Sequence, residues 1–555
     1  MTHQLLTTRS WDFLGLPQTP PQELPLEAEV IIGMLDTGIW PDSPSFSDDG
    51  FGPPPSRWKG AGQNFTCNNK IIGARVYDHD QGSISGLSPL DEVGHGSHTA
   101  STVAGRALAN VSYGGLAAGT ARGAVPDARL AIYKVCVGEF CSSADILAGF
   151  DDAIADGVDI ISFSIGGMFP MQYFESAQAI GSFHAMRRGV LTSASAGNSG
   201  LDGGHVSNVA PWMLSVAASS IDRRFVDTLV LGNGDTIVGT SINTFPTVAN
   251  ATLALPPRES CDPDNLGGSL YRGKILLCPH DGSDGQGPLL AGAAGIVLVT
   301  DSPDVAFELP LPGLDPDLSA PGIDIIALWS PLATPKVPYN LISGTSMACP
   351  HASGAAAYVK SFHRDWSPAM IMSALITTAT PMNTPGNSKT TAFKYGAGQL
   401  NPVKANDPGL VYDASESDYI AILCVQGYNA TQLALITGFN ATVSPSDLNY
   451  PTMAAHVEAG KNFNVSFPRT ATNVGAASDA YDVKIIISIE AAKDIAIVVS
   501  PSKLEFSAQN QKIPFTVTVS GVPPLDGQVH SAAIVWYNNE HEVRSPVVVY
   551  TEADW

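Results

Sequence analysis

Apolar and polar residues follow two alternating patterns along the first part of the chain. Residues 29–37 (EVIIGMLDT) form a short apolar run that predicts a buried strand of the parallel type, with Asp36 at its end. Strand-like and helix-like segments then alternate over residues 128–137, 143–157, 158–167, 175–189 and 190–198. Strands separated by helices of this length predict a parallel sheet with helices on its faces.

A different pattern begins near residue 225. Residues 229–243 predict a hairpin with an Asn-Gly turn, and residues 273–278 and 291–301 predict further strands. The α/β pattern resumes at residues 317–330, so the segment between is predicted to be an insertion. After about residue 445, strands recur at regular spacing with Pro and Gly turns, which predicts a β-sandwich of about a hundred residues.

The stretch ISGTSMACPHASGAAAYVK, residues 342–360, combines a helical pattern with small side chains at Ala348, Ala352, Ala355 and Ala356. This spacing predicts a helix packed too closely for larger groups. Pro350 is tolerated only in an early turn, so the helix should begin near Ser346. A hydroxyl there lies beside unpaired N–H groups and the positive end of the helix dipole. Ser346 is therefore either a helix cap or, given a base and a carboxylate elsewhere, a reactive group.

Composition excludes several classes of protein. The chain has 555 residues, of which 44% are hydrophobic and 15% charged, as expected of a folded protein with several domains. Its net charge of −23 argues against nucleic acid and against anionic lipid as partners. No run of 18 apolar residues predicts a membrane span, and the N-terminal residues lack the apolar region of a signal peptide.

Sequons and cysteines point to a secretory route. Asn-x-Ser/Thr sequons predict glycosylation at Asn64, Asn110, Asn250, Asn429, Asn440 and Asn464. The pairs Cys136 with Cys141 and Cys261 with Cys278 would each close a short loop, and both are predicted disulfides. The chain has seven cysteines, an odd number, so at least one thiol stays unpaired. We expect it to be Cys349, because its helix is too tightly packed to offer a partner.

Three polar residues could act together with the hydroxyl of Ser346, two by activating it and one by stabilising an oxyanion. Asp36 ends a predicted strand, where open α/β sheets place their sites, and His95 lies in a Gly-flanked loop before a small-residue helix. An imidazole activates a serine best when a carboxylate fixes its tautomer. Asn198 could donate its side-chain amide to an oxyanion, together with the Ser346 backbone N–H. Taken singly, each residue also has an ordinary structural explanation. Asp36 could be a capping residue, His95 a surface histidine and Asn198 a turn former.

Two further features concern ligands. Residues 162–167 (SFSIGG) end in bare backbone that suits an extended peptide pairing as an added strand, unless they form a core strand closing in a turn. His98 could form a metal pair with His95, but no His-Glu-x-x-His or Cys-x-x-Cys set accompanies it. We therefore expect no metal and no other cofactor.

The order Asp, His, Asn, Ser along the chain is the subtilisin order. The segments DTGIWPDSPSF, GHGSHTAST, SASAGNSG and SGTSMACPHASG resemble the motifs of plant subtilases, the cucumisin-like serine endopeptidases. TTRSWDFLG resembles the N-terminus of these enzymes after their propeptide is cut. The resemblance covers nearly the whole chain from about residue 7.

The resemblance implies a secreted, glycosylated, calcium-independent endopeptidase of the apoplast or cell wall. Such an enzyme acts on polypeptides, and its own propeptide serves as chaperone and inhibitor. The implied site residues are Asp36, His95 and Ser346 for the triad, Asn198 for the oxyanion, and Ser164, Ile165 and Gly166 for pairing with the substrate.

The implied fold class is α/β with two β-rich additions. A subtilisin-like parallel sheet with helices on both faces would occupy residues 7–225 and 315–445. An inserted protease-associated domain would occupy residues 226–314, and a fibronectin-III-like β-sandwich residues 446–555.

The insertion departs from the family pattern. Members carry a longer insertion, followed by a strand like Phe-Ser-Ser-x-Gly-Pro before an APG segment. Here LVTDSPDVAFELPLPGL runs almost directly into DPDLSAPG. We expect half of the insertion and one catalytic-domain strand to be absent, which would expose strand edges and loosen the Ser346 region. The shortening also disfavours a homodimer formed through the insertion.

Two rival hypotheses remain open. The first is a glycoprotein that acts by binding through its β-domains, with its active site disabled by the missing strand. The second is an aspartic protease, because Asp-Thr-Gly at residues 36–38 is also the signature of that class. Aspartic proteases need two carboxylates that share a proton, and the chain has no second Asp-Thr/Ser-Gly.

Overall fold

The computed structural model describes most of the chain in two compact units. The described residues are 9–17, 27–79, 86–138, 140–167, 170–199, 206–256, 260–266, 269–279, 286–299, 316–382, 395–441, 443–444, 446–488, 491–524 and 529–551. One unit comprises Met1–Arg223 and Phe307–Trp555, and the other comprises Arg224–Ala306.

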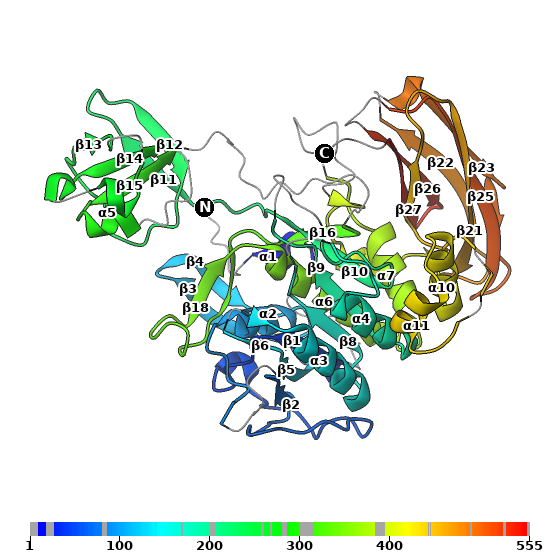
Figure 1. Ribbon diagram of the computed structural model, residues 1–555, viewed down its shortest axis with the longest axis horizontal. Coiled ribbons are helices and arrows are strands. Elements are labelled where there is room, and N and C mark those ends of the chain that lie inside the picture. The colour runs from blue at the N-terminus through cyan, green and yellow to red at the C-terminus, as the bar shows by residue number, and fades with distance from the viewer. Residues whose placement is uncertain are drawn as a thin grey trace. The chain divides into compact units, whose positions relative to one another are not determined.

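A seven-stranded parallel sheet forms the centre of the first unit (Figure 1). Its strand order is β16-β10-β9-β8-β1-β5-β2, and every neighbouring pair is parallel. The strands are β1 (Ile31–Asp36), β2 (Ile71–Val76), β5 (Arg129–Lys134), β8 (Ile160–Phe163), β9 (Leu191–Ser195), β10 (Met213–Ser219) and β16 (Leu318–Pro321). The predicted parallel sheet is thus confirmed.

Helices cover both faces of this sheet, because successive side chains of a strand point to opposite faces. In β1, Ile32 and Met34 share a core with α2 (His95–Ala104), α6 (Thr345–Phe362) and α7 (Pro368–Thr377). Ile31 and Leu35 share the opposite core with α3 (Ser143–Asp156), α4 (Ala177–Arg187), α10 (Glu416–Val425) and α11 (Ala430–Thr437). Asp36, an even-numbered neighbour of Met34, therefore lies on the α2 face.

Helix α6 runs against the sheet with the small residues that its sequence pattern predicted. Ala348, Ala352, Ala355 and Ala356 have no exposed surface. A Cβ atom added at Gly354 would lie 2.6 Å from the Cβ of Ala124. Small side chains are needed here because the helix approaches its neighbours so closely.

Three hairpins and several short turns complete this part. The hairpins are β3 (Leu108–Tyr113) with β4 (Leu116–Ala121), β6 (Cys136–Val137) with β7 (Phe140–Cys141), and β17 (Ile325–Leu328) with β18 (Tyr339–Ile342). Short helices are α1 (Ser10–Phe13) and α9 (Pro402–Ala405), with 3₁₀ turns at Glu27–Glu29 and Pro44–Phe46. Within the described residues, no helix is both long enough and apolar enough to cross a membrane.

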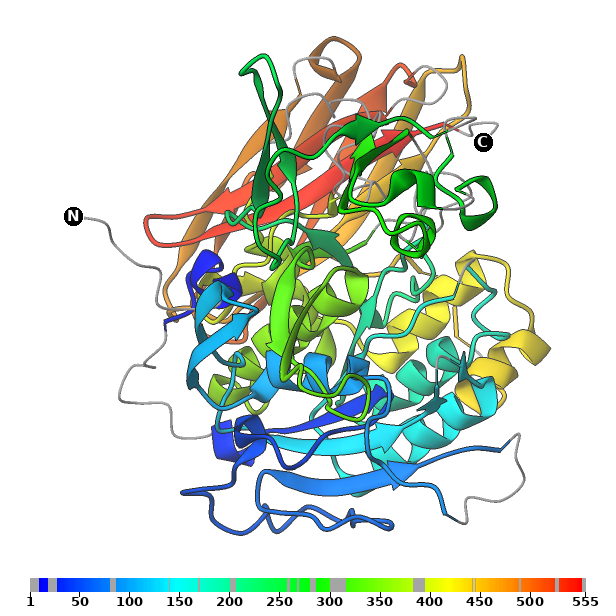
Figure 2. The ribbon, with the colours of Figure 1, turned by 90° about the vertical axis from the view of Figure 1, so that its left-hand side faces the viewer.

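A β-sandwich occupies the C-terminal part of the same unit, drawn in orange and red in Figure 1 and, from another side, in Figure 2. One sheet has the order β19-β21-β25-β23 and the other β20-β27-β26-β22-β24. The strands are β19 (Leu410–Val411), β20 (Met453–His456), β21 (Phe463–Asn473), β22 (Ala480–Ile487), β23 (Ile495–Ser500), β24 (Lys503–Glu505), β25 (Lys512–Gly521), β26 (Val529–Tyr537) and β27 (Glu542–Tyr550), with a 3₁₀ turn at Ala491–Lys493. Trp536 and Phe515 lie in its core. The sandwich predicted from strand spacing is confirmed.

The second unit contains two small sheets. The predicted hairpin is formed by β11 (Val226–Val230) and β12 (Thr236–Thr240), and it turns through residues 231–235. A parallel sheet contains β13 (Leu253–Ala254), β14 (Ile275–Pro279) and β15 (Gly295–Val299), with α5 (Gln286–Leu290) and 3₁₀ turns at Pro263–Asn265 and Ser269–Tyr271. A disulfide joins Cys261 to Cys278. Residues 300–315, where the sequence predicts the shortened junction, lie outside the described residues.

Candidate active site

Asp36 is the last residue of β1 and is 2% exposed. Its Oδ1 accepts hydrogen bonds from the backbone N–H of Thr37 (2.8 Å) and from Nδ1 of His95 (2.7 Å). Its Oδ2 accepts from the hydroxyl of Thr99 (3.0 Å). Every partner donates to this carboxylate, so the proton of the histidine lies on Nδ1.

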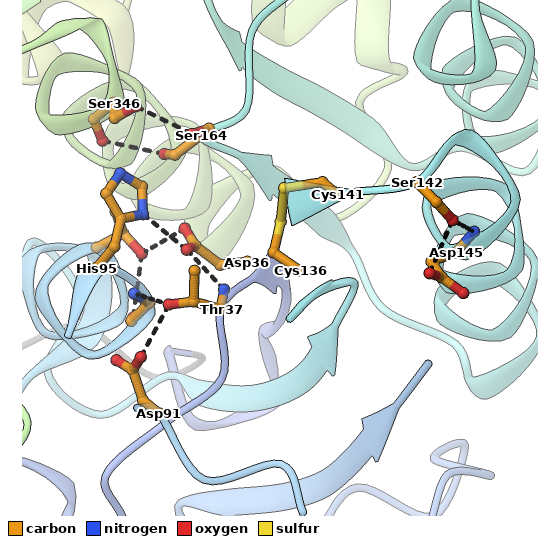
Figure 3. Close-up of a disulfide and its surroundings, with 12 residues drawn as sticks. Asp36, Thr37, Asp91, His95, Cys136, Cys141, Ser142, Asp145, Ser164 and Ser346 are labelled. Carbon is orange, nitrogen blue, oxygen red and sulfur yellow. Dashed lines mark hydrogen bonds and ion pairs between the residues drawn. A yellow bond between two sulfur atoms is a disulfide. The ribbon is translucent and has the colours of Figure 1, made fainter. Parts of the chain in front are cut away.

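His95 is the first residue of α2, and two glycines permit its position. Gly94 precedes the helix with φ at 94°, a left-handed conformation that favours glycine. A side chain at Gly96 would collide with the carbonyl oxygen of Gly38. In the view of Figure 3, the imidazole ring lies between Asp36 and Ser346, and about a quarter of the side chain is exposed (26%).

The environment of His95 favours its charged form. Burial alone would lower the pKa of the imidazole, but the charge of Asp36 and its hydrogen bond outweigh that effect. Together with the charge of Asp91, they raise the pKa of His95 above the ordinary histidine value. A nearby carboxylate thus stabilises the imidazolium that forms when the ring accepts a proton.

Ser346 lies in the first turn of α6 and is held by Ser164. The hydroxyl of Ser346 donates to the carbonyl oxygen of Ser164 (3.0 Å). In return, the hydroxyl of Ser164 donates to the carbonyl oxygen of Ser346 (3.0 Å). Pro350, four residues on, has no N–H to donate to that carbonyl, so Ser164 supplies the donor that the helix lacks. The structure therefore brings Ser346 directly onto the segment that follows β8.

Asn198 reaches the same helix start from the loop after β9. Its Oδ1 accepts from the backbone N–H (2.9 Å) and the hydroxyl (2.8 Å) of Thr345. These two donors fix the orientation of the amide. Its Nδ2 lies 3.2 Å from the position of a Cβ built on Gly344, so the donor side of the amide faces the loop that precedes Ser346.

The segment Ser164–Gly166 has only part of its backbone free. Ser164 is buried, Ile165 is half-buried and Gly166 is exposed. The carbonyl oxygen of Ile165 accepts from Nδ2 of Asn208 (2.8 Å). An added peptide strand would therefore use the backbone of Gly166 and the carbonyl of Ser164.

The other sequence candidates lie as follows. His98 is buried, and its Nε2 bonds to the carbonyl of Ile325 (3.0 Å). Burial lowers the pKa of His98 to about 3, so the ring is neutral. Within the described part of the chain, no group of three or more His, Cys, Asp or Glu residues could hold a metal ion.

Figure 3 shows a disulfide in the same region as Asp36 and His95. A disulfide joins Cys136 to Cys141 across the β6–β7 hairpin, which follows β5, the neighbour of β1. Among the described residues, the free cysteines are Cys67, Cys349 and Cys424.

Three residues around the Asp36–His95 pair were not predicted from the sequence: Thr37, Thr99 and Asp91. Asp91 has no exposed surface and accepts several hydrogen bonds from the residues around His95. Its position just before a Gly-flanked helix start is the only sequence signal, and an ordinary capping residue produces the same signal. The partners of Asp36 are an imidazole, a hydroxyl and a backbone N–H, and not the second carboxyl group that an aspartic protease needs.

Two family models together match most of the chain. The model described as the subtilase family matches residues 27–398, and a fibronectin type-III domain matches residues 447–549.

Known proteins resemble the chain over almost its full length. The subtilisin-like protease SBT4.3 of Arabidopsis thaliana is 43% identical over 633 residues, covering 99% of this chain and 85% of that protein. SBT4.10 of the same plant is 44% identical over 593 residues, covering 99% and 83%. The crystal structure of a cold adapted subtilisin-like serine proteinase has a TM-score of 0.37 and 16% identity, covering 68% of this chain and 92% of that one, too low a similarity to support an inference. The chain therefore belongs to the subtilase family: it is a serine-type endopeptidase with a fibronectin type-III domain at its C-terminal end.

Proposed function

We propose that this protein is a secreted endopeptidase that hydrolyses polypeptides through an acyl-enzyme. Ser346 is the nucleophile, His95 the general base, Asp36 the group that orients His95, and Asn198 a donor to the oxyanion. The observation that carries the proposal is the 2.7 Å hydrogen bond between His95 Nδ1 and Asp36 Oδ1. With the proton held on Nδ1, the lone pair of Nε2 is available to accept the serine proton.

The reaction begins with a rotation of the serine hydroxyl. In the structure this hydroxyl donates to the carbonyl of Ser164 rather than to His95. Catalytic hydrogen bonds are commonly longer or differently directed before substrate binds. A substrate backbone N–H that pairs with the Ser164 carbonyl would displace the hydroxyl and turn it toward the imidazole. Substrate binding and activation of the nucleophile are then one event.

The next steps of the proposed reaction are proton transfer and stabilisation of the oxyanion. As the Ser346 oxygen attacks the scissile carbonyl, His95 takes its proton and becomes an imidazolium beside Asp36. The negative charge on the former carbonyl oxygen is met by Nδ2 of Asn198 and by the Ser346 backbone N–H, which has no acceptor in the first helical turn. His95 then protonates the leaving amine, and water repeats the sequence to release the acid.

Secretion and maturation form the wider part of the proposal. All six sequon asparagines are exposed, as attachment of a glycan requires. Exposure together with disulfides supports passage through an oxidising compartment. We place the enzyme in the apoplast or cell wall, with its own propeptide as chaperone and inhibitor and with no cofactor.

Active-site labelling tests the proposal. A fluorophosphonate probe is expected to label the parent protein and not Ser346→Ala, because the probe reacts only with an activated serine. Equal labelling of both proteins would reject the assignment. Cut sites in a denatured protein mixture, read by mass spectrometry, would then define the specificity.

A second candidate is a protein of this fold that binds without cleaving. It is favoured by the alignment with SBT4.3, which spans 633 positions although this chain has 555 residues, so that relative carries residues with no counterpart here. Its signature is a cooperatively folded parent protein that the probe does not label.

A further inference from the structure

Asp91 connects the start of α2, where His95 lies, to the end of β1, where Asp36 lies (Figure 3). The carboxyl group of Asp91 is fully buried. Its donors are the Thr37 hydroxyl (2.9 Å), the backbone N–H groups of Val93 (3.1 Å), Gly94 (2.8 Å) and Ser97 (2.8 Å), and the Ser97 hydroxyl (2.7 Å). Each contact is an N–H or O–H that donates to a carboxyl oxygen, the role of an ionised carboxylate.

Thr37 carries this connection to the strand. Its hydroxyl donates to Asp91 and accepts from the backbone N–H of Gly96 (2.8 Å), while its own N–H donates to Asp36. The two residues that flank His95 are therefore both tied to the residue that follows Asp36: Gly96 directly, and Gly94 through Asp91. The residues before and after His95 are thus held to Thr37, which directly follows Asp36. These contacts fix the distance between the carboxylate of Asp36 and the imidazole of His95.

Asp91 also acts on His95 through its charge, which is one of the causes that raise the pKa of that ring. The titratable groups that interact electrostatically with His95 or with Asp91 include Asp36, His98 and Lys134, and Lys134 also interacts with Glu92. Lys134 donates from Nζ to the carbonyl of Leu90 (2.6 Å), and burial lowers its pKa. Lys134, the last residue of β5, is thus a cation that interacts electrostatically with Asp91.

We propose that Asp91 is a positioning residue for the reaction, which holds the Asp36–His95 pair at its working separation and stabilises the imidazolium from beyond Asp36. Thr37 connects Asp91 to the end of β1 through the hydrogen bond of its hydroxyl. The inference rests on the proposed roles of Asp36 and His95, and it assigns a second buried carboxylate to the same proton transfer.

Two substitutions distinguish the effect of the charge of Asp91 from the effect of its hydrogen bonds. In Asp91→Asn the negative charge is lost, and one of the two accepting oxygens becomes an NH2 group that cannot accept from the donors around it. We therefore expect kcat to fall about 10- to 100-fold with KM within about threefold, because a small misplacement of the base is costly. The acid limb of the pH profile of kcat/KM also moves to lower pH, because the imidazolium loses a stabilising charge. In Thr37→Val the charge stays and the connecting hydroxyl is lost, so kcat falls about tenfold while the acid limb stays in place.

Matched variants control for simple loss of stability. Thr37→Ser keeps the hydroxyl and is expected to lose at least about fivefold less turnover than Thr37→Val. Asp156→Asn removes another buried carboxylate, bound to Arg75 (2.8 Å) and Tyr133 (3.0 Å), and is expected to lower the thermal midpoint without moving kcat or the acid limb.

Each outcome decides the inference. If Asp91→Asn does not fold, the comparison of Thr37→Val with Thr37→Ser decides alone. A kcat within twofold of the parent in the folded Asp91→Asn and Thr37→Val variants would overturn the role of Asp91 while the triad stands. A parent protein that resists the fluorophosphonate probe removes the proposed function and this inference together.

Discussion

At the scale of single residues, a side-chain hydrogen bond at the site replaces a backbone hydrogen bond that the helix cannot make. Pro350 leaves the carbonyl of Ser346 without its helical donor, and the hydroxyl of Ser164 fills that place. The alanines and Pro350 could be read as features of one helix from the sequence. The donor could not be foreseen, because it lies 182 positions away along the chain.

Removing the Ser164 hydroxyl tests this compensation. Ser164→Ala leaves the carbonyl of Ser346 unpaired, so the free energy of unfolding should fall by about 1 to 2 kcal/mol. We expect kcat to fall about threefold to tenfold with KM nearly unchanged, because the backbone that we propose to pair with substrate stays in place. Denaturant unfolding and steady-state kinetics measure the two effects.

Ser361→Ala is the matched control, because it removes another buried hydroxyl, which donates to the carbonyl of Tyr358 (2.7 Å) at the end of α6 opposite to Ser346. It should lower stability alone. If both variants lose stability equally and neither loses kcat, Ser164 has no part in holding Ser346 in position for reaction.

At the scale of elements, close packing decides where α6 can lie. The sequence predicted a helix that begins near Ser346 and has a small-residue face, and the helix runs over Thr345–Phe362. Local spacing was sufficient for this because the 3.6-residue period is a property of the segment itself. The neighbours that require small residues, Ala124 and Trp11, could not be predicted because they belong to other segments.

A larger side chain in α6 tests this packing. In Gly354→Val the first added carbon would meet Ala124 at 2.6 Å and Trp11 at 3.2 Å. We expect the free energy of unfolding to fall by about 1 to 3 kcal/mol, although valine has the higher helix propensity. The measurement is thermal or denaturant unfolding, with Gly52→Val as the control, because a Cβ at Gly52 meets open space. Equal stability of the two variants would contradict the packing argument.

At the scale of the whole first unit, the sandwich is joined to the parallel-sheet part by polar contacts. The hydroxyl of Tyr450 donates to the carboxyl group of Asp317, just before β16. Arg544 of β27 donates to the carbonyl of Ala397 (2.9 Å), and β19 adds a strand to the sandwich by pairing with β21. The sequence predicted both parts, but strand patterns carry no information about which faces meet.

The Asp317 contact makes stability depend on pH. Burial raises the pKa of Asp317 to about 7, against the opposing effect of hydrogen bonds from Tyr450 and Ser215. The folded protein therefore holds this proton between about pH 4 and pH 7, where the unfolded chain has released it. Stability from this group is present at low pH and is lost as pH rises through about 7.

Asp317→Asn, which is neutral at every pH, isolates this effect. Between pH 5 and pH 8 the parent should lose about 1 to 3 kcal/mol of unfolding free energy relative to the variant. Denaturant unfolding at the two pH values measures the difference. The comparison with the variant is needed because burial also raises the pKa of Glu27 to about 7, which contributes the same trend to both proteins. Parallel pH profiles would show that Asp317 does not carry the effect.

Periodicity, turn residues and motifs are local properties, so the kinds of element, their order and the residue types available for chemistry could be predicted without the structure. The hydrogen bond of Asp36 to His95, the bond from Ser164 to the carbonyl of Ser346 and the bonds from the start of α2 to Asp91 were visible only in the folded structure. These contacts join segments far apart in the chain, and hydrogen-bond geometry depends on how packed strands and helices place their ends in space. The sequence therefore indicates which groups are available at this site, and the fold sets the distances between them.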